Sequence, residues 1–202
     1  MHGKGRLDPA PVGVYGGTMT LPPDPRPLLG EPLPLDLLDT HWIEGGELQD
    51  LLATVEGTRI WLRSAALDDE LRPRRVDGEL REALCATRAA IAAVAEHPDD
   101  ASARERFNTV LARGHRAVSL ESDGPRSVVV VDDPVWRIGW LAAETYLDLV
   151  SRMPDRIRQC THPQCVLWYL DTSRSGTRRW CSMAICGNRT KAQRHQRNQA
   201  SG

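Results

Sequence analysis

Cysteines are the residues of this chain whose type and spacing point most directly to chemistry. Four of the five lie late in the sequence, at Cys160, Cys165, Cys181 and Cys186, as two C-x4-C pairs with fifteen residues between them. Two such pairs joined by a hairpin-sized insert can supply four thiolates to one tetrahedral Zn²⁺ ion. The sequence therefore predicts one structural zinc ion held by these four cysteines.

The rest of the composition places this site in a cytoplasmic protein. No stretch approaches the ~20 apolar residues of a membrane span, and the N-terminal residues lack the apolar run of a secretory signal. Thiols stay reduced in the cytoplasm, so clustered cysteines there are more often metal ligands than disulfides. We therefore expect no membrane partner.

Other uses of the cysteines stay open at this point. Two disulfides would take the same four residues but suit a reducing compartment poorly. An iron–sulfur cluster also binds thiolates, although none of its usual spacings is present. His162, inside the first pair, could replace one thiolate, but we expect it to be a turn residue. Cys85 stands alone in an apolar helical pattern and is interpreted as a core residue.

A β-hairpin and a helix are expected to position the four ligands. Residues 166–170 are strand-like, residues 173–176 are turn-like, and residues 177–180 could return as the second strand. The sequence from Ser182 onward favours a helix, which would place Cys186 near the helix start. This arrangement is treble-clef-like, with two tryptophans, Trp168 and Trp180, expected in its core.

Basic side chains surround the cysteine pairs. From Arg152 to the C-terminus ten Lys or Arg face two Asp, a net charge of +8, whereas residues 1–151 carry a net charge of −9. Such an asymmetry is typical of a polyanion-binding end, and a zinc-braced basic helix fits the major groove of DNA. The alternatives are a solvated tail, or arginines that pair with the acidic domain or flank Trp180. The candidate DNA contacts are Arg174, Arg178 and Arg179 on the predicted hairpin, and Arg189, Lys191, Arg194 and Arg197 on the predicted helix.

The chain ahead of the cysteines is expected to form a mostly helical domain. Capping residues and apolar spacing predict helices at about 54–66, 76–96, from 99–102 to about 120, and after Asp133-Pro134. A β-branched run predicts a strand at 127–131, and residues 33–40 are ambiguous between strand and helix. The fold prediction is mainly α (α+β overall). It has a flexible Pro/Gly-rich leader at 1–29, a helical domain at 30–152 and a zinc finger at 153–202.

The motif around the second cysteine pair is similar to that of a known family. The run DTSRSGTRRWCSMAICGNRTKAQRHQR, residues 171–197, resembles the CGNR zinc-finger family, named for the residues found here at 186–189. Residues 30–40, GEPLPLDLLDT, resemble the opening of the ABATE-type domain that usually precedes this finger, with Asp39 where an asparagine is common. The family is described as stress-induced transcriptional regulators, mainly bacterial. The resemblance implies zinc binding by the four cysteines and DNA binding by the finger.

The favoured function is a transcriptional regulator that binds double-stranded DNA through the finger. The N-terminal domain would sense a small-molecule effector or form a homodimer. Four tryptophans, at 42, 61, 136 and 140, could line an effector pocket or belong to the core. The alternative function is a zinc–thiolate redox switch, or a module for protein or RNA interaction, without sequence-specific DNA binding.

No enzymatic activity is expected. Four thiolates close the coordination sphere of zinc, whereas a catalytic zinc keeps one position open. The chain also contains no phosphate-binding loop and no G-x-S-x-G or H-E-x-x-H motif. Three polar residues that lie close in sequence, Asp36, Asp39 and His41, are expected to serve caps and turns.

Overall fold

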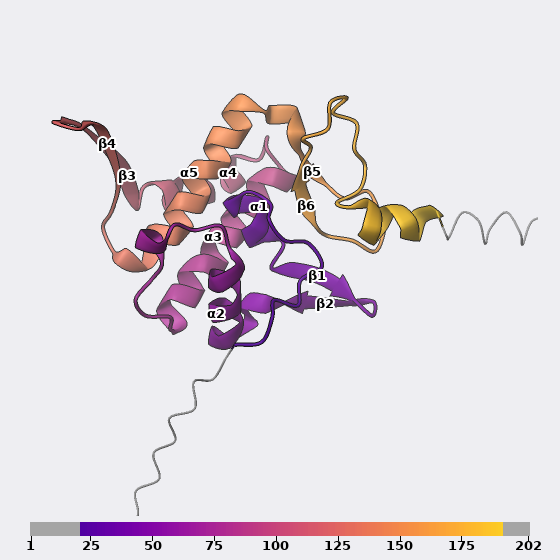
Figure 1. The fold of residues 1–202 in the computed structure, drawn as a ribbon. Helices are drawn as coiled ribbons and strands as arrows, with labels where there is room; N and C mark the ends of the chain where they lie inside the picture. The colour runs from indigo at the N-terminus through magenta and orange to yellow at the C-terminus, as the bar shows by residue number, and fades with distance from the viewer. Residues whose placement is uncertain (1–20, 192–202) are drawn as a thin grey trace, which may run out of the picture.

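A helical body and a small cysteine-rich lobe make up residues 21–191, the part of the chain that the computed structural model describes (Figure 1). The helices of the body are α1 (Leu33–Leu38), α2 (Val55–Ser64), α3 (Gly78–Glu96), α4 (Ala101–Leu111) and α5 (Arg137–Arg152). Its two antiparallel hairpins are β1 (His41–Glu44) with β2 (Glu47–Asp50), and β3 (Gly114–Glu121) with β4 (Gly124–Val131). The lobe holds a third hairpin, β5 (Ile157–Gln159) with β6 (Trp168–Leu170), and a π-type helical turn, Met183–Gly187, which continues as helix to Lys191. The predicted combination of a helical domain and a small finger with short hairpins is confirmed.

The long helix α3 is the centre of the body and contacts α1, α2, α4 and α5. Its apolar residues recur at helical spacing, and Leu84 and Ile91 have no solvent exposure. The approach of α5 to α3 is close enough to require a glycine. A Cβ on Gly139 would lie 2.4 Å from Oγ1 of Thr87. In the described residues, no helix combines the length and apolar character that crossing a bilayer requires.

Side-chain caps set the starts of two predicted helices. Oγ1 of Thr54 accepts a hydrogen bond from the Gly57 N–H (3.0 Å), and Oδ1 of Asp77 accepts one from the Leu80 N–H (3.1 Å). Each bond satisfies an N–H that has no partner within the helix. The predictions for 54–66 and 76–96 are confirmed within about two residues. The ambiguous segment 33–40 forms the helix α1.

The helix predicted to reach residue 120 is wrong in its second half. It ends at Leu111, and residues 114–121 instead form β3, paired with all eight residues of β4. The predicted strand at 127–131 is therefore one arm of a longer hairpin. Its two-residue loop is Ser122-Asp123, and Gly124 begins β4 opposite Glu121 at φ +125°. An Asp-Gly dipeptide is a turn signal in the sequence, and here this signal outweighs the weak helical pattern before it.

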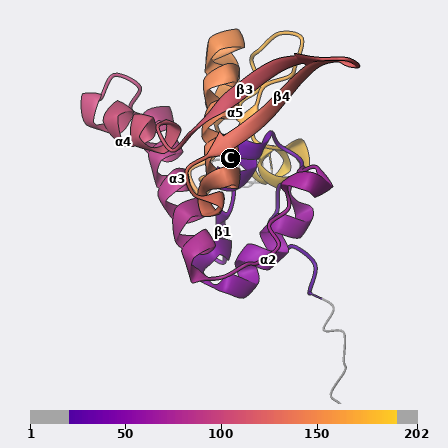
Figure 2. The same ribbon diagram turned by 90° about the vertical axis from the view of Figure 1, so that its left-hand side faces the viewer.

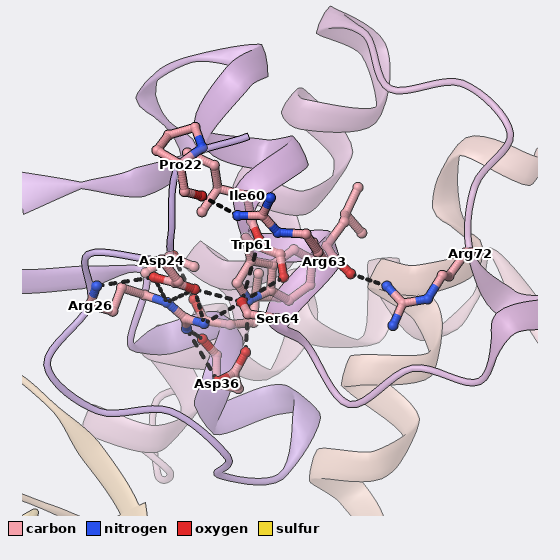
Figure 3. A network of polar contacts seen from close by, with 12 residues as sticks. Pro22, Asp24, Arg26, Asp36, Ile60, Trp61, Arg63, Ser64 and Arg72 are labelled. Atoms are coloured by element: carbon pink, nitrogen blue, oxygen red, sulfur yellow. Dashed lines mark hydrogen bonds and ion pairs between the residues drawn. The ribbon is translucent and has the colours of Figure 1, made fainter. Parts of the chain in front are cut away.

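The segment 21–29, part of the predicted leader, is held against the body by Arg26. Arg26 is 4% exposed, and its guanidinium pairs with Asp24 at 2.8 Å and with Asp36 at 3.2 Å. Asp36 also accepts a 2.9 Å hydrogen bond from the indole N–H of Trp61, while Ser64 donates one to Asp24 (Figure 3). Burial raises the pKa of Asp36, and the charge of Arg26 opposes that rise. Residues 1–20, the rest of the predicted leader, lie outside the described residues.

Removing the buried guanidinium should destabilise the whole body. Arg26→Ala would leave the carboxylate of Asp36 buried without its cation, which costs about 3–5 kcal/mol. The matched control is Arg59→Ala, because Arg59 makes an exposed ion pair with Glu56 (3.2 Å), and such a pair contributes at most about 1 kcal/mol. Urea unfolding followed by circular dichroism measures both losses. Equal losses would show that residues 21–29 do not hold the body together.

Candidate metal centre

The four predicted ligands meet at one point of the lobe. Their sulfur atoms all lie within 4.8 Å of one another. Sγ of Cys181 is 3.7 Å from that of Cys186 and 3.9 Å from that of Cys165. A tetrahedral ion with Zn–S bonds of about 2.3 Å separates its sulfurs by about 3.8 Å. The arrangement fits one structural zinc ion with four thiolate ligands.

Without a cation the four thiols oppose one another's ionisation. Hydrogen bonding with Cys160 raises the pKa of Cys165 to about 12 and also raises the pKa of Cys181, while burial raises the pKa of Cys186. The pKa of Cys160 is lowered, because the neighbouring thiols of Cys165 and Cys181 donate hydrogen bonds to its thiolate. One thiolate is thus stabilised at the expense of the others. Four thiolates at this spacing require a dication among them.

A tight turn presents the first cysteine pair. Cys160 directly follows β5, and its N–H donates to the Leu167 carbonyl (2.9 Å) just before β6. The Cys165 N–H donates to the carbonyl of His162 (3.0 Å). His162 is 3% exposed, and its Nδ1 accepts a hydrogen bond from the Gln164 N–H (3.1 Å). The structure therefore places His162 in the turn, as predicted, and outside the group of four ligands.

The second pair is presented by the start of the last helix. Oγ of Ser182 accepts a hydrogen bond from the Ala184 N–H (3.1 Å), which caps the first turn. The Cys186 N–H donates to the Ser182 carbonyl (3.0 Å), and the Cys186 carbonyl accepts from the Thr190 hydroxyl (2.8 Å). The prediction that the fourth ligand lies near the helix start is confirmed.

The predicted hairpin between the pairs is wrong in its second strand. The partner of β6 is β5, with Arg158 opposite Tyr169, and residues 177–180 form a loop. Asp171, which is 2% exposed, closes that loop. Its carboxylate accepts hydrogen bonds from the N–H (3.0 Å) and hydroxyl (2.6 Å) of Ser173 and from the Arg178 N–H (3.0 Å). The bonds from Ser173 hold the pKa of Asp171 below its usual value.

Arg178 braces the site from within the lobe. Its guanidinium lies 4.3 Å from the centre of the Tyr169 ring and donates to the carbonyls of Trp180 (2.8 Å) and Cys181. The Tyr169 hydroxyl donates in turn to the Arg178 carbonyl (2.7 Å). Arg178 therefore makes structural contacts within the lobe, and its assignment as a DNA contact stays a prediction.

The other candidate contacts divide into two groups. Exposed on the lobe are Arg174, Arg179, Arg189 and Lys191. The guanidinium of Arg179 lies 5.8 Å from the ring centre of the half-buried Trp180, which it flanks. Arg194 and Arg197 lie outside the described residues.

Two carboxylates join the lobe to the body. Oδ1 of Asp39 accepts the Trp168 N–H (2.7 Å), and Oε2 of Glu31 accepts the Leu170 N–H (2.9 Å). Both N–H groups point away from β5, along the edge of β6 that no strand covers in the described residues. Asp39 is 1% exposed, and burial raises its pKa well above the usual value.

Sequence reasoning missed this joint. Asp36 and Asp39 were expected in caps and turns, but both side chains make buried bonds to distant segments. His41 of β1 pairs with Asp50 of β2, at 3.1 Å, within one hairpin. The one sign of this joint in the sequence is Asp39 itself, at a position where an asparagine is common. Nearby residues give no indication of its hydrogen-bond partner, because the Trp168 N–H is 129 residues away in the chain.

A cavity of about 480 Å³ lies between the β1–β2 hairpin and the lobe. Trp42 and Ile43 line it from the hairpin, whereas Cys165, Ile185 and Arg189 line it from the lobe. Of the four tryptophans of the body, Trp42 is thus the one placed at this cavity. The tryptophans at 61 and 140 are buried with their indole N–H groups hydrogen bonded, and the one at 136 lies under the guanidinium of Arg113.

Replacing a ligand cysteine should weaken zinc binding strongly, whereas replacing the fifth cysteine should not. The protein is expected to hold one zinc ion per chain by elemental analysis. Cys181→Ser should lose its zinc at a chelator concentration that leaves the wild type loaded, because one of the four thiolates is gone and an oxygen ligand holds zinc less tightly than a thiolate. Cys85→Ser is the control, since Cys85 lies half-buried in α3 near the Leu52 carbonyl. Zinc held as tightly by Cys181→Ser as by the wild type would contradict the four-thiolate site.

The joint should make stability depend on pH. Because burial raises the folded-state pKa of Asp39 above 3.8, its carboxyl supports folding below that value and loses this contribution as the pH rises through the folded pKa. Asp39→Asn keeps an oxygen acceptor without the charge. The free energy of unfolding of this variant should therefore increase relative to that of the wild type as pH rises. Asp39→Ala leaves the Trp168 N–H unpaired and should be about 1–3 kcal/mol less stable than Asp39→Asn at every pH.

Denaturant titrations over the pH range in which zinc stays bound would measure these differences. A constant gap between Asp39→Asn and the wild type across that range would show that Asp39 does not titrate in the folded protein.

The comparison with known families agrees with this division of the chain. Residues 31–152 match the family model ABATE, described as "Putative stress-induced transcription regulator". Residues 156–199 match the model of the CGNR zinc finger. No curated protein matches the chain. The match to the first model spans more than half of the sequence and includes the whole helical body, and the second includes all four cysteines. The chain therefore belongs to the ABATE family and carries a CGNR zinc finger at its C-terminal side.

Proposed function

We propose that this chain is a transcriptional regulator that binds double-stranded DNA through the zinc-braced lobe. The observation that carries the proposal is the charge of the lobe surface. Arg174, Arg179, Arg189 and Lys191 are exposed, whereas of the two carboxylates of the lobe Asp171 is buried and only Asp155, at the junction with α5, is exposed. A surface of this sign attracts the phosphates of nucleic acid.

The zinc site would give these charges a fixed geometry. Arg189 and Lys191 lie three and five residues after the ligand Cys186, in the helical segment that begins at Met183 and contains that ligand. A bound metal ties this helix to the first cysteine pair, so the basic side chains are held with little loss of entropy on binding. The planar guanidinium of Arg189 suits phosphate oxygens or a guanine edge. Loss of zinc would release the helix and with it the DNA contacts.

The body is proposed to sense a small-molecule effector. The cavity beside the lobe is bounded by Trp42 and Ile43 on one side and by Ile185 and Arg189 on the other. A ligand there would contact the residue that we assign to DNA. The carboxylates of Asp39 and Glu31 would transmit any shift of the β1–β2 side to β6. A closed four-thiolate zinc supports a regulatory role over an enzymatic one, because it leaves no coordination position for a substrate.

Neutralising the exposed helix charges should weaken DNA binding in a salt-dependent way. For a random-sequence duplex, Arg189→Ala with Lys191→Ala should weaken affinity about tenfold. The slope of log Kd against log salt concentration should fall by about two, because each lost phosphate contact removes about 0.9. Fluorescence anisotropy over a salt series measures both quantities.

The control removes the same charge from the body. Arg104→Ala with Arg106→Ala changes two exposed arginines of α4 and should leave both affinity and slope near the wild-type values. If the two double variants behave alike, the interface lies elsewhere or the binding reflects net charge alone. Either outcome would contradict the assignment of Arg189 and Lys191 as DNA contacts.

A further inference from the structure

The β3–β4 hairpin is the most exposed apolar feature of the described residues. It leaves the body beside α5 and extends beyond it (Figures 1 and 2). Val118 is 78% exposed and Leu120 is 83% exposed, and Val128 and Val130 are each about 40% exposed. Val128 and Val130 lie opposite Ala117 and His115, so they share the other face of the hairpin from Val118 and Leu120. A two-stranded hairpin is marginally stable in water on its own, and large apolar side chains grouped on an exposed face are a mark of an interaction site. A partner that covers one face would stabilise the hairpin.

The register shows which face of the hairpin carries its most exposed apolar side chains. Side chains alternate along β3, so Arg116, Val118 and Leu120 share one face. The guanidinium of Arg116 makes a two-pronged bond to Glu144 of α5, at 2.9 and 2.8 Å. The face that carries Val118 and Leu120 is therefore the face turned toward α5.

The helix beside this face is apolar as well. Leu147 lies one turn after Glu144 and is 50% exposed, and Val150, a turn further on, is 36% exposed. The ribbons of the hairpin and α5 diverge from the base that the Arg116–Glu144 pair holds together (Figure 1). We call the surface made by Val118 and Leu120 on the hairpin and by Leu147 and Val150 on the helix the notch; all four side chains are exposed.

We propose that the notch is a homodimer interface in which the hairpin of one copy lies in the notch of a second copy. Val118 and Leu120 of each chain would pack against Leu147 and Val150 of the other, and the contact would be repeated by a two-fold axis. Such an interface is isologous, since the same surface contributes both the inserted part and the receiving part. The notch suits such an interface, because each chain carries both an apolar hairpin that can be inserted and an apolar helix that can receive it.

The area is sufficient for a reversible dimer. Two paired strands of eight residues form a ribbon about 27 Å long and about 10 Å wide, so one face covers about 250 Å². With a similar area of α5, each copy would bury about 500 Å², and the pair about 1,000 Å². This total lies at the lower end of specific interfaces, so we expect a dimer that dissociates on dilution.

Charge argues against nucleic acid as the occupant. The tip carries Glu121 and Asp123, which would repel phosphates. Both arginines of the hairpin are already paired, Arg116 with Glu144 and Arg126 with Glu121. The hairpin and the cysteine-rich lobe also lie on opposite sides of the body (Figure 1). A dimer formed through the notch would leave both fingers free, as binding to two half-sites requires.

The test compares two exposed leucines on different hairpins. Leu120→Asp places a charge in the proposed interface, and Leu48→Asp places the same charge at a 61% exposed position of β2. Sedimentation equilibrium without DNA, up to about 100 μM protein, should give the wild type and Leu48→Asp a mass approaching twice 22.5 kDa. Leu120→Asp should remain near one chain mass, with a dimer dissociation constant at least tenfold higher. Leu147→Asp should behave in the same way, because it changes the receiving wall of the notch.

Circular dichroism should show all three variants folded, since each replaced side chain is at least half exposed. A wild type that stays monomeric over the whole range would overturn the proposal. So would a dimer that Leu120→Asp leaves as tight as Leu48→Asp does. The measurement contains no nucleic acid, so its result is independent of whether the lobe binds DNA.

Discussion

The mutual repulsion of four thiolates, relieved by one cation, is the constraint on which the functional half of the structure depends. The lobe from residue 154 to residue 191 contains only one short hairpin and one helix start, and its buried apolar residues Leu167, Trp168 and Tyr169 join the core of the body. Its cysteines bring their sulfurs to the spacing of a zinc tetrahedron, where ionisation of all four is unfavourable without metal. We therefore expect the cysteine-bearing turns of the lobe to order only when the metal binds.

The second requirement is a fixed relation between the lobe and the body. Two carboxylates accept the N–H groups that β6 exposes on its free edge, which ties a three-residue strand to the residues around α1. The same part of the body is held by the buried cluster of Arg26, Asp24 and Asp36. Charged groups thus add directional bonds to a junction that apolar packing of Trp168 and Tyr169 against the core of the body also holds. The cost is a buried carboxyl at Asp39 whose ionisation opposes folding.

Local signals in the sequence were enough to predict the metal site and most helices. The C-x4-C pairs identify the ligands, and Thr54 and Asp77 mark helix starts, because each signal acts within a few residues. Features that depend on distant segments could not be predicted in this way. Examples are the pairing of β5 with β6, the structural role of Arg178, and the bond from Trp168 to Asp39. The predicted helix covers β3, although the Asp123-Gly124 turn signal favours a hairpin there, because helical spacing alone does not show where a helix ends.

The central claim is that zinc holds the lobe in a form that recognises DNA sequence. Its most direct test is selection of bound duplexes from a random pool, with the zinc-loaded protein and the chelator-treated protein in parallel. The account predicts an enriched motif with the zinc-loaded protein and none after chelation. Absence of any enriched motif while zinc remains bound would contradict it, and would direct attention to RNA, protein partners or a thiolate switch.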